Sequence, residues 1–195
     1  ISAAAARVRF TRQGNTPAYY VIAETGFDRT PQENLSQGLE IIRDFIDSNG
    51  NVLTSVKVGD EFLVRLRLRA TSRDRVSQIA VVDLLPGGVE PVLELQPTAD
   101  SSTPAEDPAA QRASPVRPLP IGLPDKSDWK PSHVDVREDR FILYGDATRN
   151  ISTFVYRVRA NNAGTFQVPP AFAEGMYNRT ISGLGRSGTL VVKEP

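Results

Sequence analysis

Apolar and polar residues alternate with a period of two along several stretches of this chain, which is the pattern of strands that bury one face. Residues 62–70 are the clearest case, because phenylalanine, valine and leucine alternate there with three arginines. Residues 154–160 repeat the alternation, and residues 189–193 carry a shorter version near the end of the chain. A more continuous apolar run at 79–85 predicts a strand that is buried on both faces.

Turn signals separate these strands. Residues 137–140 lie between two short alternating runs and predict a hairpin over 133–144. The apolar positions of residues 39–46 fit neither the helical nor the strand period. We predict a strand there because the turn-forming residues 47–51 follow directly. Many short strands joined by turns of glycine, proline and asparagine predict an all-β fold, an antiparallel β-sandwich.

Two segments depart from this pattern. Residues 96–126 hold seven of the fifteen prolines, and they contain too few apolar side chains to order themselves. We therefore expect residues 96–128 to be a long, mobile, disordered Pro-rich insertion within a sandwich that spans residues 27–195. Residues 1–26 predict a short strand pair that belongs to a neighbouring domain or to a linker.

Composition narrows the function classes. The 23 lysines and arginines balance 23 aspartates and glutamates, so no net charge attracts nucleic acid or an anionic membrane. The chain has no cysteine and one histidine, which excludes disulfides, thiolate metal sites and cysteine nucleophiles. No apolar stretch has the length of a transmembrane helix, and the N-terminus does not resemble a signal peptide. We expect a piece of a longer protein that is not an enzyme and needs no cofactor or metal.

Three motifs suggest chemistry that their surroundings do not support. Residues 183–188 match the glycine pattern of dinucleotide-binding sites, but only seven residues follow and they predict a strand, so we expect a flexible hairpin turn. Residues 47–51 begin like a calcium loop, yet Val52 stands where glycine is required, which favours an ordinary turn. His133 and Asp135 could form a catalytic triad only with a nucleophile on an exposed, sharp turn, and the sequence offers none. We therefore predict that His133 is a surface or capping residue.

The arginines at positions 65, 67 and 69 form a stripe on one face of their predicted strand. The stripe has no exposed aromatic residues beside it, so it is weak evidence for nucleic-acid binding. We expect a solvated sheet face on which acidic side chains of a neighbouring strand pair with the arginines. The same stripe would also suit contact with an adjacent domain.

The most informative stretch is residues 164–177. A short strand pattern ends at a double proline, which has no backbone N–H to extend a ladder. A loop of small apolar residues follows and ends in the only methionine and a tyrosine. Loops normally face water and are polar, so this one suggests a surface that a partner covers; alternatively, its last two residues plug the end of their own sandwich. The predicted inter-domain docking residues are Pro169, Pro170, Phe172, Met176 and Tyr177.

Several segments together resemble the C-terminal region of bacterial alpha-2-macroglobulins. The resemblance covers residues 26–195 without the proline-rich insertion, and it depends on the order of the segments rather than on any single motif. The resembling segments are 26–28 (GFD), 35–39 (LSQGL), 58–61 (VGDE), 80–88 (AVVDLLPGG), 135–140 (DVREDR), 155–160 (VYRVRA) and 168–177 (VPPAFAEGMY).

The resemblance implies the last macroglobulin-like β-sandwich, of immunoglobulin-like architecture, in a large periplasmic protease inhibitor, with residues 1–26 ending the preceding β-rich domain. In the family, cleavage of a bait region triggers a rearrangement, and many members trap the protease through a Cys–Gln thioester in a separate helical domain. The terminal domain packs on that helical domain, where a Met-Tyr pair shields the thioester from water. Met176 and Tyr177 match this pair. A second bacterial group lacks the thioester, and the form of the motifs favours that group.

The resemblance also implies partners and a location. The expected partners are other domains of the same parent chain, target proteases bound through the parent, and proteins of the cell envelope, but not nucleic acid. The parent is expected in the periplasm, attached to the inner membrane as a lipoprotein. An alternative is a module of a bacterial surface adhesin or repeat protein, because residues 82–89 resemble the Asp-x-Leu-Pro-x-Gly turn of such repeats. Against it, the chain shows no internal repeat and has only four lysines for a cross-link.

Overall fold

The computed structural model describes residues 9–11, 13–14, 17, 19–21, 33–93 and 122–195. The chain divides into two compact units, Ile1–Thr30 and Pro31–Pro195. In the first unit, the rings of Phe10 and Tyr20 stack with their centroids 4.3 Å apart. The described residues of that unit lie in no strand, and the rest of the strand pair predicted over residues 1–26 lies outside the described residues.

In the described part of the second unit, all regular structure is β-strand. Over the same residues, no helix has the length and apolarity needed to cross a bilayer. The strands are β1 (Leu35–Gln37), β2 (Leu39–Ile46), β3 (Ser55–Lys57), β4 (Glu61–Ala70), β5 (Arg75–Leu84), β6 (Val89–Pro91), β7 (His133–Arg137), β8 (Arg140–Thr148), β9 (Ser152–Ala160), β10 (Gly164–Val168), β11 (Phe172–Gly175), β12 (Ser182–Leu184) and β13 (Gly188–Lys193).

Every strand predicted from alternation is present. Strands β4, β5, β9 and β13 include the predicted stretches except for Leu85, and β7 with β8 forms the predicted hairpin. The ambiguous stretch at 39–46 is strand β2, which pairs with β4 along its whole length, from Leu39 opposite Ala70 to Ile46 opposite Leu63. The turn after β2 therefore identified the strand correctly where the apolar period did not.

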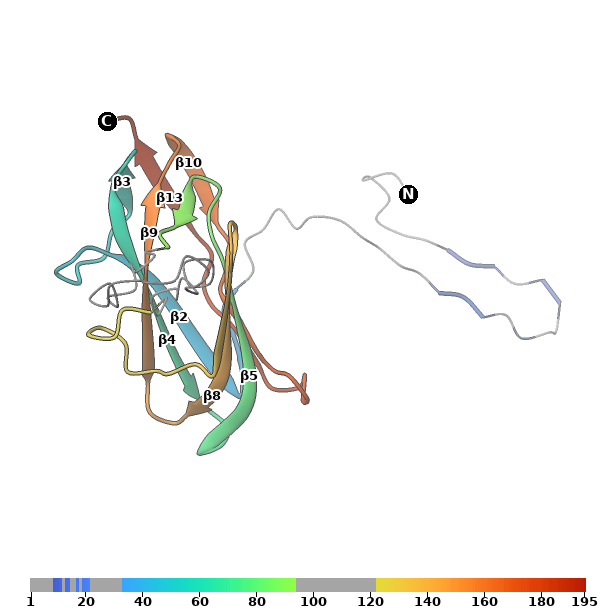
Figure 1. Ribbon diagram of the computed structural model, residues 1–195. Helices are drawn as coiled ribbons and strands as arrows, with labels where there is room; N and C mark the ends of the chain where they lie inside the picture. The colour runs from blue at the N-terminus through green and yellow to red at the C-terminus, as the bar shows by residue number, and fades with distance from the viewer. Residues whose placement is uncertain (1–8, 12, 15–16, 18, 22–32, 94–121) are drawn as a thin grey trace, which may run out of the picture. The chain divides into compact units, whose positions relative to one another are not determined.

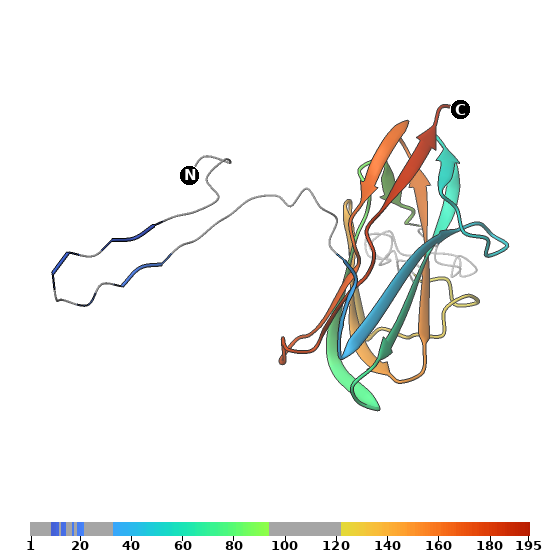
Figure 2. The ribbon, with the colours of Figure 1, turned by 180° about the vertical axis from the view of Figure 1, so that it is seen from behind.

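The strands form two packed layers, which Figures 1 and 2 show from opposite sides. One layer contains the four-stranded sheet β2-β4-β9-β6, and the other contains the six-stranded sheet β1-β12-β11-β5-β8-β7. A third sheet, β10-β13-β3, lies at the end of the sandwich that carries the C-terminus (Figure 1). The named strands pair antiparallel, as predicted, except that β13 and β3 run parallel.

The core lies between the two layers. On β4, the phenylalanine, valine and leucines that alternate with the arginines are buried, as are Phe141 and Leu143 on β8. The rings of Phe141 and Tyr156 stack across the layers with centroids 3.7 Å apart. This unit therefore has a hydrophobic core of its own, which is what a domain needs to fold independently.

The prediction that a mobile insertion extends to residue 128 is wrong for residues 122–128. Leu123 packs on Ile46, Leu63 and Val155, which form a small cluster on the four-stranded sheet. The Leu123 amide donates to the Val155 carbonyl at 2.8 Å, and Lys126 Nζ donates to the Ser48 carbonyl at 2.8 Å. An apolar side chain and backbone hydrogen bonds hold this segment in place. The rest of the predicted insertion, residues 96–121, lies outside the described residues.

Candidate docking site

The predicted apolar loop contains a strand. Strand β10 ends at Val168, and two prolines follow it. Strand β11 then begins at Phe172, which pairs with Leu184 on one side and Val82 on the other. The double proline interrupts the ladder, as expected, but it lets the chain change from the three-stranded to the six-stranded sheet. The loop prediction is therefore wrong for residues 172–175, because pairing with strands that are distant in sequence outweighs the local signal.

The glycine motif at residues 183–188 is the matching crossing on the return path. Because β12 and β13 belong to different sheets, the predicted hairpin turn is wrong, and residues 185–187 carry the chain between sheets. A Cβ at Gly183 would lie 2.6 Å from the Leu39 carbonyl oxygen, so this glycine allows β2 to approach closely.

A buried charge network secures the crossing at Pro169. Arg43, on β2, donates from Nη1 to Asp83 Oδ1 at 2.5 Å and to the Leu84 carbonyl at 3.0 Å, and from Nη2 to the Pro169 carbonyl. The Tyr156 hydroxyl donates to Asp83 Oδ2 at 2.5 Å. The side chain of Asp83 is fully buried and that of Arg43 is 4% exposed. These bonds join the four-stranded sheet, the six-stranded sheet and the base of β11.

Burial dominates the titration of this network. Desolvation raises the pKa of the Asp83 carboxyl, while the charge of Arg43 and the hydrogen bond from Tyr156 oppose the rise. Burial, together with the neighbouring Asp83 charge, raises the pKa of the Tyr156 hydroxyl well above its ordinary value, so Tyr156 remains a donor. The network is a structural element inside the fold.

The hairpin of β11 and β12 ends in a short exposed tip, which we define as residues 176–180. Its base is closed by the Gly175 amide donating to the Ile181 carbonyl at 2.9 Å. Inside the tip, Asn178 Oδ1 accepts from the Thr180 hydroxyl at 2.6 Å. Met176 is 45% exposed and Tyr177 is 80% exposed. The alternative in which these two residues plug their own sandwich is therefore wrong.

The structure divides the five predicted docking residues into two groups. Met176 and Tyr177 lie together at the tip. Pro169, Pro170 and Phe172 are half-buried at the other end of β11, near the sheet crossing. A docking surface made of all five would have to extend along the whole strand.

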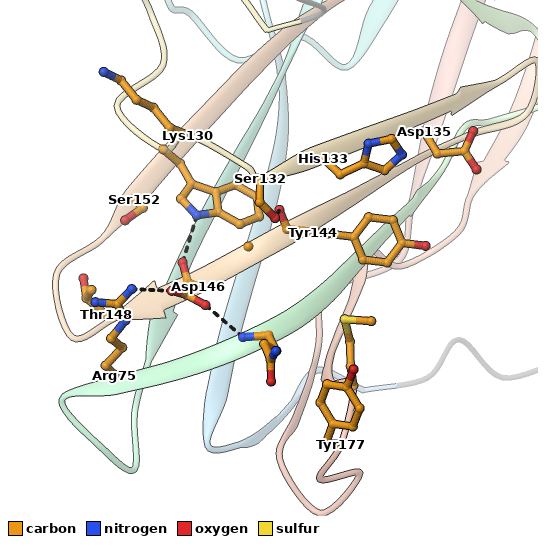
Figure 3. A pocket seen from close by; sticks show the side chains of 14 residues that line it. Arg75, Lys130, Ser132, His133, Asp135, Tyr144, Asp146, Thr148, Ser152 and Tyr177 are labelled. Atoms are coloured by element: carbon orange, nitrogen blue, oxygen red, sulfur yellow. Dashed lines mark hydrogen bonds and ion pairs between the residues drawn. The ribbon is translucent and has the colours of Figure 1, made fainter.

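A groove of about 750 Å³ lies beside the tip. Figure 3 shows His133 and Tyr144 on one side of it and Tyr177 on the other, with the side chain of Asp146 reaching from β8 toward Arg75. The rings of His133 and Tyr144 lie 5.8 Å apart, and His133 is exposed, as predicted for a surface residue. Asp135 accepts from Arg137 at 3.2 Å. Within the part of the chain that the structure describes, no hydrogen bond joins His133 to Asp135.

Sequence reasoning missed the residues that hold the tip, above all Gln78 and Asp146. The Met176 amide donates to the Gln78 carbonyl at 2.9 Å, and the Gln78 amide donates to Asp146 Oδ1 at 2.8 Å. One signal was available: Val76 and Ile79 are both apolar but three positions apart, where alternation requires two or four. Such a slip indicates a β-bulge.

The remaining motifs have structural roles. Arg65 and Arg67 both donate to Asp44 Oδ2, at 3.0 and 2.9 Å, and Arg69 donates to Glu40. Both acids lie on β2, so the predicted cross-strand pairing of the stripe is confirmed. Asp47 Oδ1 accepts from the amides of Asn49 and Asn51 at 2.9 Å each, which is an ordinary turn. Hydrogen bonds from Asn51 are the main cause of a lowered pKa at Asp47.

The fold and the projecting hairpin define a class of protein, the β-sandwich modules of the macroglobulin type. A crystal structure of native alpha-2-macroglobulin from Escherichia coli, spanning domain MG7 to the C-terminus, aligns with 86% of this chain and 25% of its own, with a TM-score of 0.64 and 28% identity. The structure of Salmonella alpha-2-macroglobulin reacted with methylamine aligns with 86% of this chain and 10% of its own, with a TM-score of 0.63 and 26% identity.

The chain belongs to the family described as the bacterial alpha-2-macroglobulin MG10 domain, whose profile matches residues 38–179. An alpha-2-macroglobulin homolog of Yersinia pestis is 36% identical over 189 residues, which is 95% of this chain and 9% of that protein. The alpha-2-macroglobulin of Pasteurella multocida is 33% identical over 181 residues, 92% of this chain and 8% of that protein. The chain therefore spans about a tenth of the length of these relatives.

Proposed function

We propose that this chain is a non-catalytic domain of a periplasmic, broad-spectrum protease inhibitor of the alpha-2-macroglobulin type, and that it docks on a neighbouring domain of the same parent chain through its hairpin tip. The single observation that carries the proposal is the pair Met176 and Tyr177, held side by side on a closed hairpin but exposed to water. Membership of the alpha-2-macroglobulin family supports this proposal and does not favour the surface-repeat alternative.

The tip is suited to bind a neighbouring surface without changing its own conformation. Backbone bonds on both sides of residues 176–180 fix the hairpin, so docking would order little additional chain. A thioether and an aromatic ring are adaptable apolar groups that pack well on irregular surfaces. Covering the exposed parts of both side chains would contribute on the order of 3 kcal/mol.

The proposal assigns a structural role to the buried charged groups. Among the described residues, no three acidic or histidine side chains gather as a metal site would require. Asp83 is the one fully buried carboxylate in the part of the chain that the structure describes, and it is bonded to Arg43 and Tyr156. In this proposal, target proteases are bound through the parent, and the parent lies in the periplasm, attached to the inner membrane, with access to envelope proteins.

Docking would have a specific consequence in parents that carry a Cys–Gln thioester. A thioester survives only where water is excluded, and a methionine with an aromatic ring would form a dry lid over it. In parents without the thioester, the same contact would hold two domains together. The upstream sequence of the parent distinguishes the two cases, because only the first contains Cys-x-x-Gln in a helical region.

Oxidation of Met176 tests the docking. It is the only methionine of this chain, so peroxide adds oxygen at one position that mass spectrometry of its peptide reports. We expect slow oxidation in the intact parent and fast oxidation in the 195-residue chain. Equal rates in both would refute docking at the tip.

Substitutions extend the test to the energetics. Met176→Ser with Tyr177→Ser should weaken the association of the two domains by about a hundredfold, as expected for a loss of roughly 3 kcal/mol. Val52→Ser is a matched control, since Val52 is also an exposed apolar residue but belongs to the turn after β2. Limited proteolysis of the parent between the domains provides the readout. An effect of Val52→Ser as large as that of the tip substitutions would contradict the proposal.

A further inference from the structure

A strained residue stands next to the tip. Gln78 has a φ of 56°, and among the described residues it is the only one other than glycine with a positive φ. It lies at a break in the register between β5 and β8, where Val76 pairs with Ala147 and Ile79 pairs with Gly145. Two residues of β5 therefore oppose the single residue Asp146, which defines a β-bulge. Such backbone strain persists only where neighbouring contacts impose it.

The bulge connects Asp146 to Met176 through its backbone. The Gln78 amide donates to Asp146 Oδ1 at 2.8 Å, and the Gln78 carbonyl accepts from the Met176 amide at 2.9 Å. Figure 3 shows the first of these bonds beside the groove. The ladder between β11 and β5 has its last pair at Gly175 and Ile79. The bond to Met176 is thus the final contact before the tip leaves the sheet.

Asp146 is itself held from two sides. Arg75 donates to its Oδ2, and the Trp129 indole Nε1 donates to its backbone carbonyl at 2.9 Å. The hydrogen bond from Arg75 is the largest cause of the lowered pKa of this carboxyl, and the Gln78 amide lowers the pKa further. The carboxylate therefore provides a fixed acceptor for an amide that the interrupted β5–β8 ladder leaves without a partner.

We propose that Gln78 and Asp146 are positioning residues for the docking tip. The bulge turns the Gln78 carbonyl toward Met176, and Asp146 holds the bulge in that conformation, so that Met176 and Tyr177 leave the sheet in one direction. The positioning of the tip is a property of this domain alone. That the positioned tip serves docking rests on the proposed function.

Amide exchange in the 195-residue chain tests the positioning without any partner. In Asp146→Ala, the amides of Gln78 and Met176 should exchange at least tenfold faster, while the core amide of Val81 keeps its rate. Asp146→Asn keeps an oxygen that can accept the Gln78 amide and should restore much of the protection. Asp135→Ala is the matched control, because it removes an aspartate from the same groove without touching the bulge. Unchanged exchange at Met176 in Asp146→Ala, or an equal effect of Asp135→Ala, would overturn the inference.

Arg75→Met provides a second route if Asp146→Ala fails to fold. The Arg75 side chain is 65% exposed, so its loss spares the core but releases Asp146 Oδ2. We expect faster Met176 exchange, by a smaller factor than for Asp146→Ala, and unchanged exchange would count against the proposal.

The same variants in the intact parent separate this inference from the proposed function. If positioning serves docking, Asp146→Ala should increase Met176 oxidation in the parent although both tip side chains are present. If Asp146→Ala acts on exchange but the tip substitutions leave the domains associated, the positioning stands and the docking proposal fails. If the tip substitutions separate the domains but Asp146→Ala does not alter oxidation in the parent, docking stands and the role of these residues in it is refuted.

Discussion

Replacing Arg43 with methionine should destabilise the fold far more than the loss of any surface arginine. Methionine keeps most of the aliphatic length but leaves the fully buried Asp83 carboxylate with Tyr156 as its remaining hydrogen-bond partner. The Leu84 and Pro169 carbonyls lose the same donor. Breaking a buried ion pair from one side costs about 3–5 kcal/mol. The cost arises because the charge that remains is neither hydrated nor paired.

Urea denaturation of the 195-residue chain measures this loss. With an m-value of about 2 kcal/mol/M, the midpoint of Arg43→Met should fall by roughly 2 M. Arg149→Met is the matched control, because Arg149 and Asp74 form an ion pair with side chains 63% and 94% exposed. Such a pair contributes about 0.2–1 kcal/mol. The double variant Arg43→Met with Asp83→Leu should recover much of the loss, since apolar groups then replace both charges. A midpoint for Arg43→Met no lower than that of Arg149→Met would refute the reasoning.

Three further predictions have definite expected outcomes. Gln78→Gly should leave the fold as stable as before or up to about 1 kcal/mol more stable in thermal unfolding, because glycine adopts the φ of 56° without strain; a loss above that size would contradict the strain argument. Gly183→Ala should lower the free energy of unfolding by about 1–3 kcal/mol, since its Cβ would lie 2.6 Å from the Leu39 carbonyl oxygen. Gly188→Ala is the control and should have little effect, because the nearest atom to its Cβ lies at 4.0 Å. Equal urea midpoints for the two variants would show that β2 can move away. The pKa of Asp83 is raised in the folded state, so the folded protein binds a proton at this carboxyl more tightly than the unfolded chain does. The resulting contribution to the free energy of unfolding is present below the ordinary carboxyl pKa of about 4 and is lost as pH rises through the folded pKa. Urea midpoints of wild type and Asp83→Asn between pH 4 and 8 should therefore diverge across that window in this direction, and a difference independent of pH would exclude a raised pKa.

The β-sandwich could be predicted because its central strands carry their burial pattern locally. On β4, every second residue is apolar and buried, while the arginines between them face acids of β2. Strand β11 escaped prediction because Ala173 within it and Ala171 directly before it are too small to produce a clear apolar signal, although both are fully buried. Its strand character comes from β5 and β12 on either side.

The candidate site was predictable only at two residues of its tip. Met176 and Tyr177 stand out in the sequence because a loop after two prolines is expected to be polar. Gln78 and Asp146 carry no such signal beyond the slipped spacing around the bulge, since their role depends on hydrogen bonds between segments far apart in the chain.

Local alternation and turn residues were sufficient to determine that this chain forms antiparallel strands, and the order of its motifs was sufficient to indicate the family. Only the tertiary structure decided where β10 crosses to β11, which charges are buried, and how the tip is held. The physical reason is the separation along the sequence of the residues that interact. Alternation reflects the solvent exposure of single residues, whereas Arg43 with Asp83 and Gln78 with Met176 meet only after distant strands have paired, and the hydrophobic core sets that pairing.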